Sequence, residues 1–404
     1  MSEVNTVKTK RIRKVHHTGR TSQVWIYLGK QFRFFINEND WKVLPMAAVI
    51  AGLVAMVIRK KFFVNMEGSL IGAFALTCVG IWNGCFNSIQ SVCRERAIIK
   101  REHRSGMHIS AYMAAHMIYQ FLLCSAQTAL TMFVLRQLSV PIPRGYGSGI
   151  ITPWMICDLG ISMFLITYAA DMMSLFLSSI SRTTTGAMTL MPFILIFQLV
   201  FSGGIIPLPE WSRPLSNFTI SNYGIRALAS QSGYNELPMT TVWNTVSGMK
   251  SSTIGGDFTV AELMEKLDSP GIEKFKDRVV LGTITVGDAE AALGLEKSDN
   301  ADQALTNPIT VGHVVEILKS SEYLSEHKDK VISLKTTVGD VLDIIGEENV
   351  KNFVQRKTAE AAHKPEYESS TRNIVRNWLM LGVFVAVFAA LATLMLEMID
   401  KDKR

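Results

Sequence analysis

Charge is scarce in this sequence. Only 19% of its 404 residues are Asp, Glu, Lys or Arg, whereas 48% are hydrophobic. The charges are clustered, and between the clusters lie mostly apolar stretches of about 20 residues, the length that crosses the roughly 30 Å hydrocarbon core of a membrane. This distribution excludes an ordinary soluble enzyme and predicts a polytopic membrane protein.

Sequence motifs for catalysis and metal binding are missing as well. No phosphate-binding GxxxxGK[ST] loop occurs, because Gly29-Lys30 lacks the upstream glycine and the following Ser or Thr, and neither HExxH nor GxSxG is present. All five cysteines lie in or beside apolar stretches, which leaves no disulfide framework or zinc-ligand spacing elsewhere. We therefore expect no catalytic residues, no metal and no cofactor bound by this chain.

One strongly charged stretch interrupts the apolar ones. It runs from Cys93 to Tyr112 and reads CRERAIIKREHRSGMHISAY. A charged side chain at the bilayer centre costs about 2.5 to 3.5 kcal/mol on insertion scales, so this segment must lie at a membrane face. Short loops rich in Lys and Arg stay in the cytoplasm. The sequence therefore predicts a cytoplasmic elbow near 94–108, between two spans.

The remaining apolar stretches complete a six-span topology with both termini in the cytoplasm of a multi-pass cell-membrane protein. A basic tail, 1–20, precedes an amphipathic helix in 21–41, which the helical spacing of its apolar residues places in the interface. A proline-rich segment, 203–229, is expected to form short re-entrant or interfacial helices, and a tail follows the last span within 374–404. The six spans are expected at about 43–58, 70–93, 109–135, 150–178, 187–202 and 374–396.

Two acids fall within the fourth predicted span. Ionisable residues inside a membrane are functional candidates by default. Asp158 lies near the outer end of the span, where we expect it to reach water. Asp171 lies deeper, and the sequence leaves open whether it serves a substrate or proton, or forms a hydrogen bond to a neighbouring helix.

An acidic segment, 236–373, lies between the fifth and last spans. Residues 235–373 carry 15 Lys and Arg against 23 Asp and Glu, whereas the rest of the chain carries 26 against 12. The opposite charge balance favours an extracytoplasmic position. The segment also contains an internal duplication, in which FTVAELMEKL matches ITVGHVVEIL and DRVVLGTITVGDAE matches DKVISLKTTVGDVL, at 258–267, 309–318, 277–290 and 329–342.

Thr-Val pairs recur through this duplication. In three of the four pairs an acid follows the Thr by three positions, as Glu262 follows Thr259, a pattern typical of helix N-caps. We therefore predict a small helical insert with two helices in each copy. The predicted fold is an all-α polytopic membrane protein with six spans, an interfacial N-terminal helix and this insert before the last span, so that 21–235 holds the other five spans.

Three motifs in a fixed order carry a resemblance to a known family. They are the interfacial helix before the first span, the string ER-x4-RE-x3-G-x3-SAY after the second, and FSGGIIPL-x-x-W with Tyr223-Gly224 after the fifth. Over residues 20–235 and 374–397 the chain resembles the membrane domain, or permease subunit, of type-2 ABC exporters of the G subfamily.

The resemblance implies a mechanism and a set of partners. A separate ATPase subunit, which would bind ATP and magnesium, would contact the elbow as a coupling helix, and a second permease subunit, in a homodimer or heterodimer, would complete the substrate pathway among membrane lipids. The residues implied in coupling are Glu95, Arg96, Arg101, Glu102, His103 and Gly106. Those implied in the substrate pathway are Asn83, Phe86, Asn87, Gln90, Ile196, Phe197 and Leu199.

The chain departs from the family pattern in three ways. A fused ATPase domain is absent, the outer loop is a repeat segment without cysteine, and Gly204-Ile205 stands where some members place a bulky aliphatic pair.

Two functions remain open. The first is a permease subunit that moves a lipid-like or amphipathic solute outward; the alternative is an ABC-like signalling or cell-envelope interaction protein whose insert binds a partner without transport. No nucleic-acid partner is expected.

Overall fold

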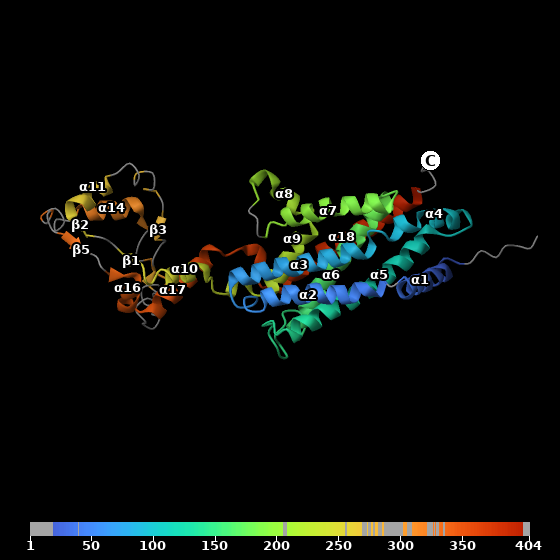
Figure 1. Ribbon diagram of the computed structural model, residues 1–404, viewed down its shortest axis with the longest axis horizontal. Helices are drawn as coiled ribbons and strands as arrows, with labels where there is room; N and C mark the ends of the chain where they lie inside the picture. Colours follow the sequence, from blue (N-terminus) through green and yellow to red (C-terminus); the bar gives the residue numbers. More distant parts are fainter. Residues whose placement is uncertain are drawn as a thin grey trace, which may run out of the picture. The chain divides into compact units, whose positions relative to one another are not determined.

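The computed structural model describes two compact units (Figure 1). The bundle unit comprises Met1–Val64, Gly68–Tyr234 and Lys364–Arg404, and the insert unit comprises Asn65–Glu67 and Asn235–His363. The described residues are 19–38, 40–204, 208–254, 257–268, 273, 276–277, 279–281, 285–286, 302–304, 309–320, 326, 328, 331–333 and 336–398.

The described residues of the bundle unit form helices and turns, without a strand. The first helices are α1 (Arg20–Asn37), η1 (Asp40–Lys42), α2 (Val43–Ile58), α3 (Met66–Ser88), α4 (Ser91–Arg104) and α5 (Ile109–Gln137). They are followed by α6 (Met155–Ile180), α7 (Thr184–Val200), η2 (Glu210–Ser212), α8 (Arg213–Ser216), α9 (Ile220–Gln231), η4 (Pro365–Tyr367) and α18 (Thr371–Glu397).

The predicted spans correspond to α2, α3, α5, α6, α7 and α18. Five helical stretches are long and apolar enough to cross a membrane, and α7 is apolar but only 17 residues long. The chain is therefore an all-α polytopic membrane protein, with short strands found only in the insert unit among the described residues. The second span ends at Ser88, earlier than predicted, and the elbow helix α4 begins at Ser91.

Glycines bring α3 and α9 against α6. A Cβ atom at Gly84 would lie 2.1 Å from the carbonyl oxygen of Thr167, so only glycine allows this backbone approach. A Cβ at Gly80 would lie 2.9 Å from the Ile166 side chain, and one at Gly224 of α9 would lie 3.0 Å from it. Small residues four positions apart are typical of close helix packing in membranes. Helix α6 is consequently central, with α5, α9 and α18 packed around it.

The proline-rich segment forms short helices, as predicted. Helix α9 begins against α7, where the Gln198 side-chain oxygen accepts hydrogen bonds from the backbone N–H groups of Ile220 (2.8 Å) and Ser221 (3.3 Å). Thr219 is the N-cap, since its hydroxyl accepts from the N–H of Asn222. These contacts satisfy the free amides at the helix start. Ile205, part of the departure noted in the sequence, lies outside the described residues.

The insert unit combines helices with very short strands. Its helices are α10 (Thr241–Gly248), α11 (Val260–Leu267), α14 (Val311–Ser320), α16 (Val338–Ile345) and α17 (Glu347–Ala361). Its strands are β1 (Thr253–Ile254), β2 (Asp257–Thr259), β3 (Val279–Leu281), β4 (Ile309–Thr310), β5 (Val331–Ser333) and β6 (Thr336–Thr337). The sequence did not predict these strands, because two or three residues are too few to show an alternating pattern.

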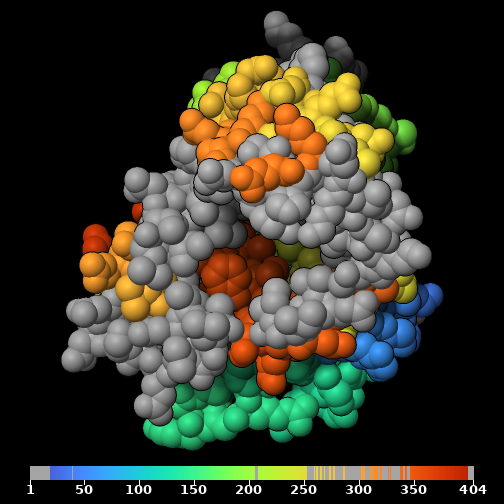
Figure 2. All heavy atoms as spheres, turned by 90° about the vertical axis from the view of Figure 1, so that its left-hand side faces the viewer, coloured from blue at the N-terminus to red at the C-terminus, as the bar shows by residue number. Residues whose placement is uncertain are grey.

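Strand pairing in the insert follows the duplication. By sequence β2 corresponds to β4 and β3 to β5, and the observed antiparallel pairs are β2 with β5 and β3 with β4. Each copy therefore donates one strand to each pair. The duplication also relates two further backbone pairings. The pair Thr253–Thr337 of β1 and β6 corresponds to the isolated bridge between Thr285 and Ala304, because Thr285 and Thr337 occupy the same position in the two copies. Helices α11 and α14, which open the two copies, lie side by side (yellow and orange in Figure 1 and Figure 2).

One of the predicted N-caps in the insert is confirmed. The Thr259 hydroxyl accepts from the N–H of Glu262 at 3.2 Å, and the Glu262 carboxylate accepts from the N–H of Thr259 at 3.1 Å. This reciprocal pair is a capping box. Asp288, predicted to complete the box of Thr285, lies outside the described residues.

Candidate functional site

Helix α4 is amphipathic, with most of its charge on the exposed face. Val92, Glu95 and Ile99 are buried at spacings of three and four residues. Arg94, Arg101 and Arg104 are exposed, and Ile98 is 37% exposed between them. The predicted coupling residues therefore divide into two sets, because Arg101 faces outward whereas Glu95 turns into the protein.

Glu95 fastens α1 and α5 to α4. Its side chain is 6% exposed, and its Oε2 atom accepts from the Lys30 ammonium of α1 at 3.0 Å. The Tyr112 hydroxyl of α5 lies 3.4 Å from the same oxygen. A buried carboxylate needs such partners to offset its loss of hydration. Glu95 thus holds the elbow in place.

A second contact between α1 and α4 lies two helical turns further on. The Tyr27 hydroxyl donates to Glu102 at 2.9 Å. Burial of Tyr27, followed by this hydrogen bond and the negative charge of Glu102, raises the pKa of the Tyr27 hydroxyl well above its ordinary value. Tyr27 therefore remains protonated and able to donate at any physiological pH.

Helices α4 and α6 cap each other. The Ser178 hydroxyl of α6 accepts from the backbone N–H groups of Val92 and Cys93, both at 3.1 Å, at the start of α4. In return, the Arg96 guanidinium donates to the carbonyl oxygens of Ser179 (2.9 Å) and Ser181 (3.2 Å), where α6 ends. A cation at a helix C-terminus also complements the helix dipole. Movement of α4 is thereby tied to movement of α6.

The end of α4 depends on glycine. Gly106 has a φ of +104°, which an L side chain rarely adopts. The Met107 N–H bonds to the Glu102 carbonyl at 3.0 Å, and a His103 ring nitrogen lies 3.0 Å from the Met107 carbonyl oxygen. Gln23 of α1 accepts from the His108 N–H at 2.9 Å and donates to the Gly106 carbonyl at 3.3 Å. Gly106 and His103 thus shape the turn into α5.

A buried polar layer joins α3 to α5 and α6. The Asn87 and Gln127 amides exchange two hydrogen bonds of 2.8 and 3.0 Å. The Ser88 hydroxyl donates to Asp171 at 2.6 Å, which is the helix-to-helix hydrogen bond left open by the sequence. Among the described residues, the other Asp171 carboxyl oxygen has no partner.

Asp158 does not reach water, contrary to expectation. It is fully buried, and its carboxylate accepts from the backbone N–H groups of Ile150, Ile151 and Thr152 at 2.7 to 2.9 Å. The sequence could not reveal this because the loop that folds over the acid is not periodic. Asp158 therefore orders the loop that precedes α6.

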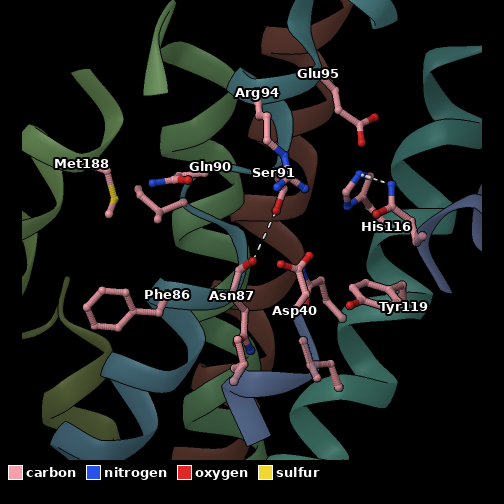
Figure 3. Close-up of a pocket in the computed structure, with 15 residues that line it drawn as sticks. Asp40, Phe86, Asn87, Gln90, Ser91, Arg94, Glu95, His116, Tyr119 and Met188 are labelled. Carbon is pink, nitrogen blue, oxygen red and sulfur yellow. Dashed lines mark hydrogen bonds between the residues drawn. The ribbon is translucent and has the colours of Figure 1, made fainter. Parts of the chain in front are cut away.

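A polar cavity of about 230 Å³ opens beside the start of α4 (Figure 3). Of the predicted substrate-pathway residues, Phe86, Asn87 and Gln90 line it, and Met188 of α7 faces them. Asn83 is buried and does not line this cavity. The α7 residues do not line it either: Ile196 is 58% exposed, Leu199 is half-buried, and the Phe197 ring lies 4.9 Å from that of Phe201.

Comparison with known proteins identifies the family to which this chain belongs. The family model for the ABC-2 type transporter matches residues 22–231, more than half of the chain. The chain belongs to this family. It is a membrane protein with the permease domain of an ABC transporter, and such domains work with an ATPase partner. The described bundle extends beyond the match through α18.

One relative adds detail to the family assignment. The ABC transporter ATP-binding/permease protein Rv1747 of Mycobacterium tuberculosis is 29% identical over 201 residues. The matched part is 47% of this chain but only 23% of the relative. The chain thus spans about a quarter of that relative's length. As its name states, this relative combines ATP-binding and permease functions in one protein.

Sequence reasoning missed most of the side chains that hold α4. On α1, Gln23, Tyr27, Lys30 and Gln31 recur at helical spacing and face α4 and α5. This polar stripe is a usable signal, although the apolar residues between its members are more prominent in the sequence. Ser178 offered no signal, since nothing in the sequence around it marks a residue that caps a different helix.

Proposed function

We propose that this chain is the permease subunit of an ATP-driven exporter that moves a lipid-like or amphipathic solute out of the cell. A separate ATPase subunit binds ATP and magnesium, and a second permease subunit completes the pathway. The proposal is supported by α4, whose buried face is fastened to α1, α5 and α6 while its other face presents exposed arginines. Such a helix can transmit a movement of the bound ATPase to the transmembrane helices.

The proposed orientation places α4 and both termini in the cytoplasm. Basic residues concentrate on α4, in agreement with the positive-inside bias. The insert unit then lies outside. The basic residues Arg59–Lys61, which follow α2, oppose this assignment locally, although long side chains can extend to the interface.

In this mechanism Arg101 contacts the ATPase and Glu95 positions the helix. Replacing Arg101 with Ala removes an exposed charge without disturbing a side-chain hydrogen bond or ion pair among the described residues. We expect substrate-stimulated ATP hydrolysis to fall several-fold in vesicles that contain the permease and its ATPase, with the protein still folded. Arg136→Ala, an exposed arginine at the other end of α5, is the matched control. Unchanged stimulation in Arg101→Ala would contradict the coupling role.

The insert unit supports a second candidate function. It is a compact unit of its own, and reciprocal strand pairing gives it internal order. An insert of this kind fits a signalling or envelope-interaction protein. Deleting residues 240–362 should leave substrate transport largely intact if the chain is an exporter. No transport by the intact chain, together with loss of a cellular phenotype when the insert is deleted, would favour the second candidate.

A further inference from the structure

The cavity beside α4 contains buried polar atoms that lack a partner in the described part of the chain. They are the Gln120 side-chain oxygen and His116 Nδ1, both on α5. Gln120 is 1% exposed and His116 is 2% exposed, and both side chains line the cavity. An unpaired buried polar group costs about 1 to 3 kcal/mol, which a bound ligand or water would recover. The cavity is therefore a site that can form further hydrogen bonds with a ligand.

The hydrogen bonds of His116 leave one of its ring nitrogens available to a ligand. The Gln31 amide nitrogen and the Tyr112 hydroxyl each lie 2.9 Å from His116 Nε2. Nε2 is therefore already engaged, whereas Nδ1 has no partner in the described part of the chain. Figure 3 shows the His116 ring beside the space that Arg94 and Asp40 bound on the other side. The wall thus presents an acceptor at Gln120 and, at His116, a ring nitrogen that donates or accepts according to its tautomer.

The charged groups of the wall do not favour an anionic ligand. Arg94 is paired with Glu38 at 2.7 Å, Glu95 with Lys30 at 3.0 Å, and Asp40 adds a carboxylate. Recognition of a phosphate needs a cation that can turn to it. The other polar side chains of the wall are neutral, and most are amides: Gln31, Asn87, Gln90, Ser91, His116, Tyr119 and Gln120.

The wall also has an apolar side, where an acyl chain could leave the cavity. Phe86 is 51% exposed and Met188 is 39% exposed, and both lie on the left-hand side of the cavity in Figure 3. Neutral donors and acceptors beside an aromatic ring are suited to hydroxyl groups. We propose that this cavity binds the uncharged, hydroxyl-rich headgroup of an amphipathic substrate, such as a glycosyl lipid. This inference rests on the proposed export function and names its substrate class.

The test measures lipid binding by the full-length chain without the ATPase. The chain is reconstituted in phosphatidylcholine bilayers with a trace of spin-labelled monoglucosyl diacylglycerol, phosphatidylglycerol or phosphatidylcholine of equal chain length. Electron paramagnetic resonance reports the motionally restricted fraction of each probe. Because one neutral hydrogen bond contributes on the order of 1 kcal/mol, about five-fold in affinity, we expect at least that preference for the glucosyl lipid.

Gln120→Met keeps the side-chain volume but removes the acceptor, so the preference should fall by about five-fold. Thr128→Val is the matched control, because Thr128 is a buried hydroxyl of α5 outside the cavity. Gln90→Met, on a half-buried residue of the wall, tests the site if Gln120→Met does not fold. Equal restriction of all three probes, or a preference for phosphatidylglycerol, would overturn the headgroup site. Selective binding without export would contradict only the proposed function.

Discussion

The bundle unit and the insert unit achieve order by different means. In the bundle, side chains from distant helices meet in the interior, as in the contacts of Glu95 with Lys30 and of Ser178 with the start of α4. In the insert, the backbones of two repeat copies pair reciprocally. The bundle therefore depends on individual residues, whereas the insert depends on a duplicated pattern. Single substitutions should consequently be more damaging in the bundle.

The largest expected effect is at Gly84. Gly84→Val would force α3 away from α6, because even a Cβ atom would lie 2.1 Å from the Thr167 carbonyl oxygen. We expect a loss of about 3 kcal/mol in the free energy of unfolding, measured by thermal or detergent titration. Gly52→Ala on α2 is the control, since its nearest neighbouring atom is 3.9 Å away. Equal stability of the two variants would show that the α3–α6 contact is not tight.

The next largest effect is expected at Glu95. Glu95→Ala would leave the Lys30 ammonium, whose side chain is 23% exposed, without its carboxylate. We expect a loss of about 2 kcal/mol in the free energy of unfolding, below the full penalty for a buried pair because Lys30 retains some water. Arg101→Ala should change coupling and leave stability unchanged. If Glu95→Ala were as stable as Arg101→Ala, the division of α4 into an inner and an outer face would fail.

A smaller effect on stability should distinguish alanine substitutions at two adjacent serines, Ser178 and Ser179. Ser178→Ala removes the hydroxyl that caps α4, whereas the Ser179 hydroxyl donates a hydrogen bond to the Phe176 carbonyl oxygen of its own helix. Loss of a helix cap costs about 1 kcal/mol. Amide hydrogen exchange in the first turn of α4 should rise in Ser178→Ala and stay unchanged in Ser179→Ala. The reverse order would remove the proposed link between α4 and α6.

The smallest effect on the whole protein is expected in the insert. Thr259→Ala breaks the capping box with Glu262, which should cost about 1 kcal/mol of local stability. Hydrogen exchange should rise in α11 and stay constant in the bundle helices. Thr358→Ala serves as the control, since this hydroxyl donates only to carbonyls within its own helix. Faster exchange in the bundle would show that the two units are coupled.

The same contrast explains how far the sequence predicted the structure. The spans, the elbow and the Thr259 cap of the insert follow from apolar length, charge clusters and local Thr-x-x-Glu spacing. The strand exchange in the insert and the inward turn of Glu95 do not, because both depend on partners far along the chain. Asp158 shows the same limit, since its ligands are backbone amides of a loop. Local chemistry was predictable, and long-range pairing was not.

The sidedness of Arg101 tests the central claim most directly. A membrane-impermeant maleimide would be applied to Arg101→Cys in sealed vesicles of both orientations, with the exposed Cys157 at the start of α6 as an internal reference for the other end of the bundle. We expect position 101 to react only from the cytoplasmic side and to be protected when the ATPase is bound. Labelling of position 101 from the external side would contradict it.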